Sequence, residues 1–312
     1  MRPQHLSVRD RGVVLLNALV IVAALAAVAV WLMQKSERSV NRLWIGQEAT
    51  QVQLYLDGLE VLLLSTLDQD KTAGTVDHLN EGWAQTTYNV PLDRGTAFAQ
   101  VSDVQGLFNI NWLTNPEDDI AQTIFRNLIR EAGLSETFAA RIEEFVSPDG
   151  PSAQTSYANR DLPMVARGGL VVTLEELMVV PGMTQAFYER LTPWLTALPP
   201  DSRLNVNTVP ASVLQAALPN TTSEGIGTLL QSRKATPFAS VGDFLNRVQN
   251  QLGPEALTNV DEARFTVVSL WFAAQLEAEL PLGDSTLRHR RNILIGRPGK
   301  TRPSRIILRR AP

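Results

Sequence analysis

The first part of the chain carries two consecutive helical patterns. Residues 13–33 are all apolar except Asn17, and a helix of this length rises about 30 Å, the thickness of a bilayer core. Apolar residues then recur every two to four positions from Leu43 to Leu67, with polar residues between them. Because no proline interrupts either pattern, the sequence predicts one continuous helix from Val13 to about Leu67. Its first half is expected in lipid, and its second half is expected to pack on a soluble domain.

The apolar segment also has to be compared with a cleaved secretory signal, which begins in the same way. Such a signal has an apolar core of about 7–15 residues followed by small residues at the cleavage site. Here the run is longer and ends in Trp31, Leu32 and Met33, shortly before Lys35, a flank typical of a membrane interface. The segment is therefore predicted to remain as an anchor. Basic residues lie on both sides of the segment, so their charge barely decides in which direction it crosses the membrane. The large domain that follows the segment favours a cytoplasmic N-terminus.

The remaining pattern changes from β to helical and back to β. Two alternating stretches at 85–90 and 96–101, separated by a turn-rich segment at 91–95, predict a hairpin. Helices are expected at 120–132, 137–146, 173–179 and 184–195, with proline or glycine in the connecting turns. Strands are expected at 264–272, 287–295 and 304–309. This order predicts an α+β fold in which a helical domain is inserted between the strands of one small antiparallel sheet.

One short motif occurs twice within the helical part. Asn109 and Asn111 alternate with apolar residues, and Asn205 and Asn207 do the same 96 positions later. Asparagine at the start of a helix or turn accepts hydrogen bonds from free backbone N–H groups. We therefore interpret the motif as a repeated structural turn and not as a ligand site.

Composition and charge narrow the function classes. The absence of cysteine excludes disulfides, thiolate metal sites and cysteine catalysis. The net charge of −4 conceals an asymmetry, because residues 288–312 hold nine Lys/Arg and no acid, which leaves 19 basic against 32 acidic residues elsewhere. We expect these arginines to face water or to pair with the acidic body, in preference to forming a patch for acidic partners.

No set of residues with catalytic spacing is present, and we expect no enzyme. The three histidines are scattered, and the sequence has no nucleophile-elbow, Walker or zinc-protease motif. Residues 204–238 do have the pattern of a helix-hairpin-helix module, a fold that also occurs in DNA-binding proteins. However, Gly225 and Gly227 are expected inside the second helix, and Arg233 and Lys234 are the only cations between Leu204 and Leu245. A phosphate backbone requires more positive charge, so we predict no nucleic-acid binding.

Several stretches resemble one known family. The junction Arg11-Gly12-Val13, followed directly by the apolar run, resembles a class III prepilin leader. Residues 101–113, 173–199, 203–219 and 232–245 are similar to the large minor pseudopilin of type II secretion systems, the general secretion pathway protein K family. The resemblance implies a pilin-like fold with a large inserted SAM-like or helix-hairpin-helix-like domain, and a subunit that initiates or caps the tip of the secretion pseudopilus for export of folded proteins.

The resemblance also implies processing, partners and location. A prepilin peptidase would cut between Gly12 and Val13 and methylate Val13. The partners would be other minor pseudopilins in a ternary tip complex, the major pseudopilin and the inner-membrane assembly platform. The chain would cross the bacterial inner membrane once, with the C-terminal domain in the periplasm. The corresponding division is a leader at 1–12, a transmembrane helix at 13–33, the pilin-like helix and first strands at 34–107, the helical insert at 108–262 and the closing strands at 263–312.

Two further residue assignments depend on the family. After cleavage Asn17 becomes the fifth residue, where most pilin-like subunits carry a glutamate that neutralises a neighbouring amino terminus; the protein K family lacks it. The family also binds calcium in the helical domain. Here the acidic loop is reduced, and Glu144, Asp149 and Asp161 remain as candidate ligands. The alternatives to a pseudopilin are a membrane-anchored DNA receptor and a minor pilin of a type IV pilus.

Overall fold

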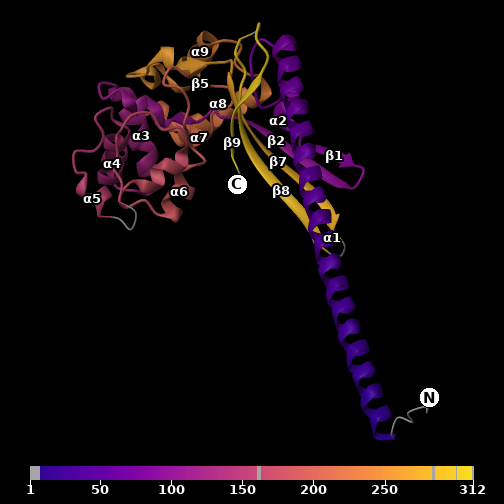
Figure 1. Ribbon diagram of the computed structural model, residues 1–312. Helices are drawn as coiled ribbons and strands as arrows, with labels where there is room; N and C mark the ends of the chain where they lie inside the picture. The colour runs from indigo at the N-terminus through magenta and orange to yellow at the C-terminus, as the bar shows by residue number, and fades with distance from the viewer. Residues whose placement is uncertain (1–7, 160–162, 283–284, 300, 311–312) are drawn as a thin grey trace.

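The computed structural model describes residues 8–159, 163–282, 285–299 and 301–310. A single 66-residue helix, α1 (Val8–Ala73), forms a stalk that extends far beyond the rest of the molecule (Figure 1). It begins before the predicted start at Val13 and continues past Leu67, because no proline interrupts it and the first glycine after Gly58 is Gly74.

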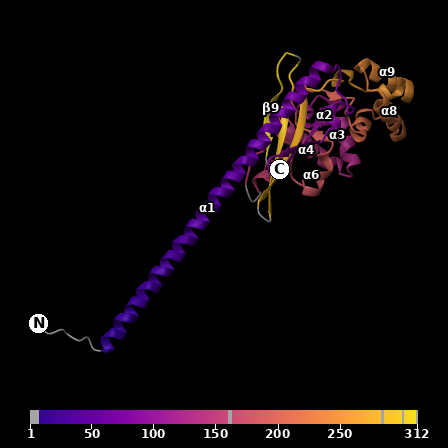
Figure 2. The same ribbon diagram turned by 90° about the vertical axis from the view of Figure 1, so that its right-hand side faces the viewer.

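The far half of α1 packs on a five-stranded antiparallel sheet with the order β1-β2-β7-β8-β9. Both views show the helix lying along this sheet while its N-terminal half remains bare (Figure 2). The strands are β1 (Tyr88–Leu92), β2 (Gly95–Asp103), β7 (Trp271–Leu282), β8 (Ser285–Gly296) and β9 (Arg305–Arg310). A short helix, α2 (Gly82–Gln85), precedes the sheet. The predicted α+β fold is confirmed.

Side-chain periodicity explains the contact between helix and sheet. The predicted apolar stripe of α1 is buried from Val52 to Leu67, whereas Leu43 is 70% exposed. Every second residue of β7 is buried against this stripe, as its two-residue period requires. The core contains Val52, Leu56, Leu59, Leu63, Leu67, Trp83, Phe272, Leu276, Leu280, Ile293 and Ile295.

The first hairpin and the last strands differ in their agreement with prediction. β1 and β2 form the expected hairpin, and Gly95 closes it with a φ of +115°; a Cβ there would lie 2.0 Å from the carbonyl oxygen of Glu279.

The predicted strand at 264–272 is wrong. The long strand is β7, which was not recognised because alanine and glutamate weaken its apolar alternation. β6 (Phe265–Thr266) pairs instead inside the helical insert, so the sheet resumes at Trp271 and not at 263.

The insert between β2 and β7 has its own hydrophobic core and consists of two units. The first contains β3 (Phe108–Asn109), η1 (Ile110–Thr114), α3 (Asp119–Glu131), α4 (Glu136–Val146), α5 (Thr155–Ala158), η2 (Leu174–Val179), α6 (Gln185–Leu191) and β4 (Leu195–Thr196). The second contains β5 (Leu204–Asn205), α7 (Ala211–Ala217), α8 (Ser223–Ala235), α9 (Val241–Leu252), η3 (Pro254–Leu257), η4 (Glu262–Arg264) and β6. The insert is therefore mainly, but not entirely, helical.

Helix starts in the insert follow the capping residues in the sequence. Side chains at five N-caps accept a hydrogen bond from the backbone of the first turn: Asp118, Ser135, Thr184, Thr222 and Ser240. Gly225 and Gly227 lie inside α8, as the sequence predicted.

The repeated asparagine motif has the same geometry in both units. Each unit joins its first and last strands in parallel, β3 with β4 and β5 with β6. Asn111 accepts from the N–H of Val171 and donates to its carbonyl oxygen, both at 2.8 Å. Asn207 bonds the N–H and carbonyl oxygen of Phe238 in the same way, at 2.8 and 3.0 Å. The prediction of a structural turn is confirmed, and the two units are copies of one local design.

Candidate functional site

The membrane-facing half of α1 has no packing partner within the described chain. Its segment from Leu15 onward is long and apolar enough to cross a membrane, with a mean hydropathy of 2.6 over an 18-residue window that is 0% buried. Leu15, Leu19 and Leu25 each expose about two thirds of their surface. A surface of this kind is stable only against lipid or other apolar helices. The helix therefore fits a single-pass membrane anchor that carries a folded C-terminal domain.

The predicted processing residues lie on this anchor. The backbone of α1 includes Gly12 and Val13, and Asn17 is exposed on the helix surface. The helix runs through the Gly12–Val13 bond, so cleavage there requires its first turns to unwind. Cleavage after Gly12 and methylation of Val13 stay predictions.

Acidic residues on the far half of α1 bind the basic C-terminal strands. Glu60 is 3% exposed and accepts from Arg291 at 2.7 Å and from Arg309 at 2.8 Å. Arg291 also contacts Asp57 at 2.6 Å. Further along, Asp68 accepts from the backbone and hydroxyl of Ser304 at 2.9 and 2.7 Å. The excess of arginine at the end of the chain thus pairs with the acidic body, as the sequence analysis expected.

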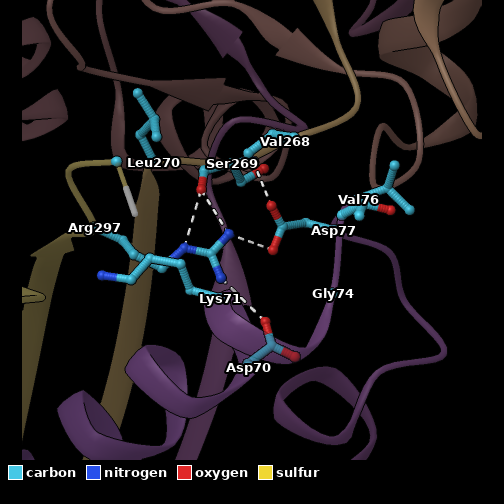
Figure 3. A pocket seen from close by; sticks show the side chains of 11 residues that line it. Asp70, Lys71, Gly74, Val76, Asp77, Val268, Ser269, Leu270 and Arg297 are labelled. Carbon is cyan, nitrogen blue, oxygen red and sulfur yellow. Dashed lines mark hydrogen bonds and ion pairs between the residues drawn. The ribbon is translucent and has the colours of Figure 1, made fainter. Parts of the chain in front are cut away.

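A buried ionic junction connects the end of α1 to the insert and the sheet (Figure 3). Arg297 is 3% exposed; it donates to Asp70 at 3.0 Å, to Asp77 and to the carbonyl oxygen of Ser269 at 2.8 Å. The second carboxylate oxygen of Asp77 accepts from the N–H of Ser269 at 2.7 Å. Burial raises the pKa of Asp70, although Arg297 opposes this shift. Breaking a buried pair of this kind costs about 3–5 kcal/mol, because one charge is left without compensation.

Asp103, at the end of β2, forms the second half of the junction. Its carboxylate accepts hydrogen bonds from the hydroxyls of Thr208 and Ser269, at 2.5 and 2.6 Å, and from the amide of Asn205 at 3.1 Å. The backbone N–H of Gln105 donates to the other oxygen at 2.8 Å. Burial raises the pKa of Asp103 to about 6 despite these four donors, and the nearby charge of Asp77 adds to the shift.

The junction also holds the one group of three acidic residues in the described chain with metal-like spacing. Oxygens of Asp70, Asp77 and Glu81 lie within 4.8 Å of one another. Glu81 accepts from the N–H of His78 at 2.9 Å and from the indole of Trp83 at 2.8 Å, and Arg297 binds the two aspartates. These partners already supply positive charge and donors, so the group forms the ionic core of the junction.

The predicted calcium residues do not form a ligand set in the described part of the chain. Glu144 and Asp149 are exposed and belong to no acidic group with metal-like spacing, and Asp161 lies outside the described residues. The loop after α4 is closed by a neutral amide: Gln154 donates to Ala166 at 2.8 Å and accepts from its N–H at 3.1 Å. Calcium binding stays a prediction, and an unchanged melting temperature on titration of the full chain with calcium would remove it.

Sequence reasoning did not identify most of the junction. Asn205 was recognised only as half of a repeated turn, and its contacts with Asp77, Asp103 and Ser269 join segments up to 128 residues apart. Nothing local distinguishes Asp77 or Arg297 from a surface residue. The one available signal was the position of Asp103 at an inward-facing place on an alternating strand, where a charged residue is unusual.

Comparisons with known proteins match both the insert and the whole chain. Two family models, each described as "Type II secretion system (T2SS), protein K", cover residues 106–200 and 204–267, together about half of the chain. Their boundaries coincide with the two units of the insert.

Relatives with the same description extend the match to the anchor and the sheet. The chain is 27% identical over 318 residues to type II secretion system protein K of Klebsiella pneumoniae, covering 94% of each chain. It is 26% identical over 309 residues to that of Pectobacterium carotovorum subsp. carotovorum, covering 92% of each. The fold is similar to a chain in the crystal structure of the GspK-GspI-GspJ complex from the enterotoxigenic Escherichia coli type 2 secretion system, with a TM-score of 0.74, 23% identity and coverage of 87% of this chain and 99% of that one. The chain therefore belongs to the protein K family of type II secretion systems and is a minor pseudopilin.

Proposed function

We propose that this subunit occupies the end of the pseudopilus farthest from the membrane and initiates or caps its assembly. The observation that carries the proposal is where the insert leaves the sheet. β2 ends at Asp103 and β7 starts at Trp271, beside the end of α1 opposite the anchor, where Asp77 bonds the backbone of Val267 at 2.8 Å. The insert thus adds bulk beside the membrane-distal half of α1 (Figure 1), where it would hinder the stacking of a further subunit.

The anchor supports assembly by lateral contact, not catalysis. Above the membrane segment, the face of α1 turned away from the sheet carries exposed apolar residues among polar ones, with Leu54 57% and Val61 67% exposed. Exposed apolar residues of this kind suit packing against neighbouring helices. We infer that the partners are the other minor pseudopilins, as in the similar complex with GspI and GspJ, followed by the major pseudopilin. The prepilin peptidase and the inner-membrane assembly platform would act on the anchor.

We infer that the anchor spans the bacterial inner membrane with a cytoplasmic N-terminus and a periplasmic C-terminal domain. The large folded domain follows the span, and Trp31 and Lys35 lie at its C-terminal boundary, with the ammonium group of Lys35 5.2 Å from the ring centroid of Trp31. Such a pair suits the membrane interface.

Site-specific photocrosslinking in the native secretion system tests the position. A photoreactive residue at Val61 should crosslink to other minor pseudopilins. One at Leu170, an exposed residue of the insert, should give no crosslink to the major pseudopilin. Because both sites are exposed, neither substitution should disturb the fold. A crosslink from Leu170 to the major pseudopilin would contradict a tip position.

Processing is tested by two substitutions in the anchor. Gly12→Leu should abolish maturation, which is visible as retention of the unprocessed chain on a gel. Asn17→Leu should be processed and should support secretion, because a subunit with nothing above it has no neighbouring amino terminus to neutralise. Loss of secretion by the processed leucine variant would contradict that explanation.

A further inference from the structure

A cavity of about 410 Å³ lies between the segment that follows α1 and the C-terminal turns of α8. The pilin-like part and the second unit of the insert each form one wall, and the side chain of Asn80 joins them by donating to the carbonyl oxygen of Lys234 at 2.9 Å. Its volume is in the range of pockets that hold small ligands. Its lining includes His78, Leu79, Gly227, Leu230, Arg233, Lys234 and Pro237.

The charge of this lining is opposite to that of most of the chain. Among the residues that the structure describes, none of those lining the cavity is acidic, whereas Arg233 and Lys234 are both cationic. They are also the only cations between Leu204 and Leu245, and both lie in the last turn of α8.

Arg233 is the central residue, because it is partly buried without an acidic partner. One of its terminal nitrogens donates to the carbonyl oxygens of Val206 and Val209, at 3.1 and 2.7 Å, which fixes the guanidinium in place. Within the described chain it makes no ion pair. Burial lowers the pKa of Arg233 to about 10, and no carboxylate opposes this shift. A held guanidinium offers further N–H donors in a planar arrangement that matches a carboxylate or phosphate.

The other lining residues add a donor and an apolar wall. Nδ1 of His78 accepts from the backbone N–H of Asn80 at 3.3 Å, which leaves Nε2 to carry the proton of the neutral ring. Leu79, Leu230 and Pro237 supply apolar surface, and Leu79 is 42% exposed. A strongly hydrated free phosphate would gain nothing from this wall, whereas an anion on an apolar body would.

We propose that this cavity is a binding site for a carboxylate carried on a partly apolar body, either an acidic side chain of a polypeptide or a small free organic acid. Arg233 and Lys234 bind the carboxylate, and the leucines and proline contact the rest of the ligand. The proposal does not depend on the position of the subunit in the pseudopilus, because the site lies within one chain.

Isothermal titration of the purified full chain in nonionic detergent tests the proposal with three probes: the tripeptide acetyl-Leu-Glu-Leu-amide, 4-methylpentanoate and inorganic phosphate. Saturable binding of the tripeptide identifies a polypeptide source, and binding of 4-methylpentanoate alone identifies a small organic acid; both support the proposal. The glutamine analogue of the tripeptide should bind at least tenfold more weakly. Binding of phosphate without either carboxylate, or no saturable binding at all, would overturn it.

Two variants separate this site from nonspecific attraction. Gly227 lies on α8, and a Cβ there meets nothing within 4 Å, so Gly227→Phe should fill the cavity and abolish binding without straining the backbone. Gly242→Phe on α9 is the matched control, since Gly242 does not line the cavity. Equal affinity in both variants would overturn the proposal.

The charge contribution is tested in the same way. Lys234 is exposed, so Lys234→Glu should fold normally and weaken binding at least tenfold. Arg130→Glu, which changes an exposed arginine of α3 outside the cavity, should bind like the wild type. An equal loss in both would indicate net charge alone and would contradict a defined site.

Discussion

The two units of the insert share a local design but differ in what they are attached to. In the first unit, the amide of Asn109 donates to the carbonyl oxygen of Pro199 at 2.9 Å and to Ser202 at 3.0 Å, both within the insert. In the second, the amide of Asn205 donates to Asp77, Asp103 and Ser269, all in or beside the pilin-like part. The first asparagine of the motif therefore makes contacts within the insert in the first unit, whereas in the second unit it connects the insert to the pilin-like part.

This difference indicates a division of roles. The second unit is joined to the segment after α1 by hydrogen bonds, from Asn205 to Asp77 and from Asn80 to Lys234, so its orientation is tied to that of the anchor helix. The first unit has its corresponding asparagine occupied within the insert, and it contacts the sheet through the exposed ion pair between Glu175 and Arg310. The comparison predicts that equivalent substitutions in the two units have different consequences.

The largest effect is expected from Asn205→Ala. The substitution removes the donor to the carbonyl oxygen of Asp77 and to the hydroxyl of Ser269, and one of the four donors to Asp103, at about 1–3 kcal/mol for each buried group left unsatisfied. We expect a loss of about 4 kcal/mol in the free energy of unfolding, together with faster hydrogen exchange at the junction in residues 74–82 and 266–270. Hydrogen-exchange mass spectrometry of the full chain in detergent measures both.

Asn109→Ala is the matched control for this prediction. It removes a comparable set of hydrogen bonds, so we expect about 3 kcal/mol of destabilisation, with increased exchange confined to residues 106–200. If Asn109→Ala also loosened the junction, the two units would not differ in attachment as their contacts indicate.

The next effect concerns pH, because Asp103, at the end of β2, accepts hydrogen bonds from Asn205 and Thr208 of the second unit. Its pKa is raised from 3.8 to about 6 in the folded protein, so between these values the folded state binds more protons than the unfolded state. Protonated Asp103 therefore stabilises the folded protein fully below about pH 4, and this contribution to the free energy of unfolding is lost as the pH rises through about 6. The full difference corresponds to about 3 kcal/mol.

Asp103→Asn tests the sign of this dependence. The amide does not titrate, so the wild type should exceed the variant in stability by more at pH 4.5 than at pH 7.5, with a change of up to about 3 kcal/mol. Thermal unfolding followed by circular dichroism at both pH values measures the difference. A difference that does not depend on pH would show that Asp103 remains charged throughout.

Much of the fold was predictable, because local rules determine it. The buried stripe of α1 follows from helical periodicity, and the helix starts follow from residues such as Ser135 and Thr184. The strand β7 was missed because Ala274 and Ala278 bury little apolar area and give a weak alternation. The anchor and the family motifs were visible because they are contiguous in the sequence.

The junction could not be predicted for the opposite reason. Arg297 is 220 positions from Asp77, and a charged residue shows no local preference for one distant partner. The excess of basic residues near the C-terminus indicated that pairing would occur, but only the register of β8 against α1 decides that Arg291 contacts Glu60. Long-range polar pairs depend on the completed packing, which periodicity does not encode.

The smallest effect, and the sharpest control on the comparison, is expected from the second asparagine of each motif. Asn111 and Asn207 bond the backbone of Val171 and Phe238 with the same geometry, and both partners lie within the insert. Alanine should cost about 2 kcal/mol at Asn207 and slightly more at Asn111, whose amide also donates to the carbonyl oxygen of Leu198 at 2.8 Å, without changing exchange at the junction in either case. If Asn207→Ala loosened the junction while Asn111→Ala did not, attachment would be a property of the whole second unit. If neither variant does, the attachment of the second unit to the pilin-like part depends on the amide of Asn205 alone. The two repeated turns then differ in function only because different residues surround their first asparagine.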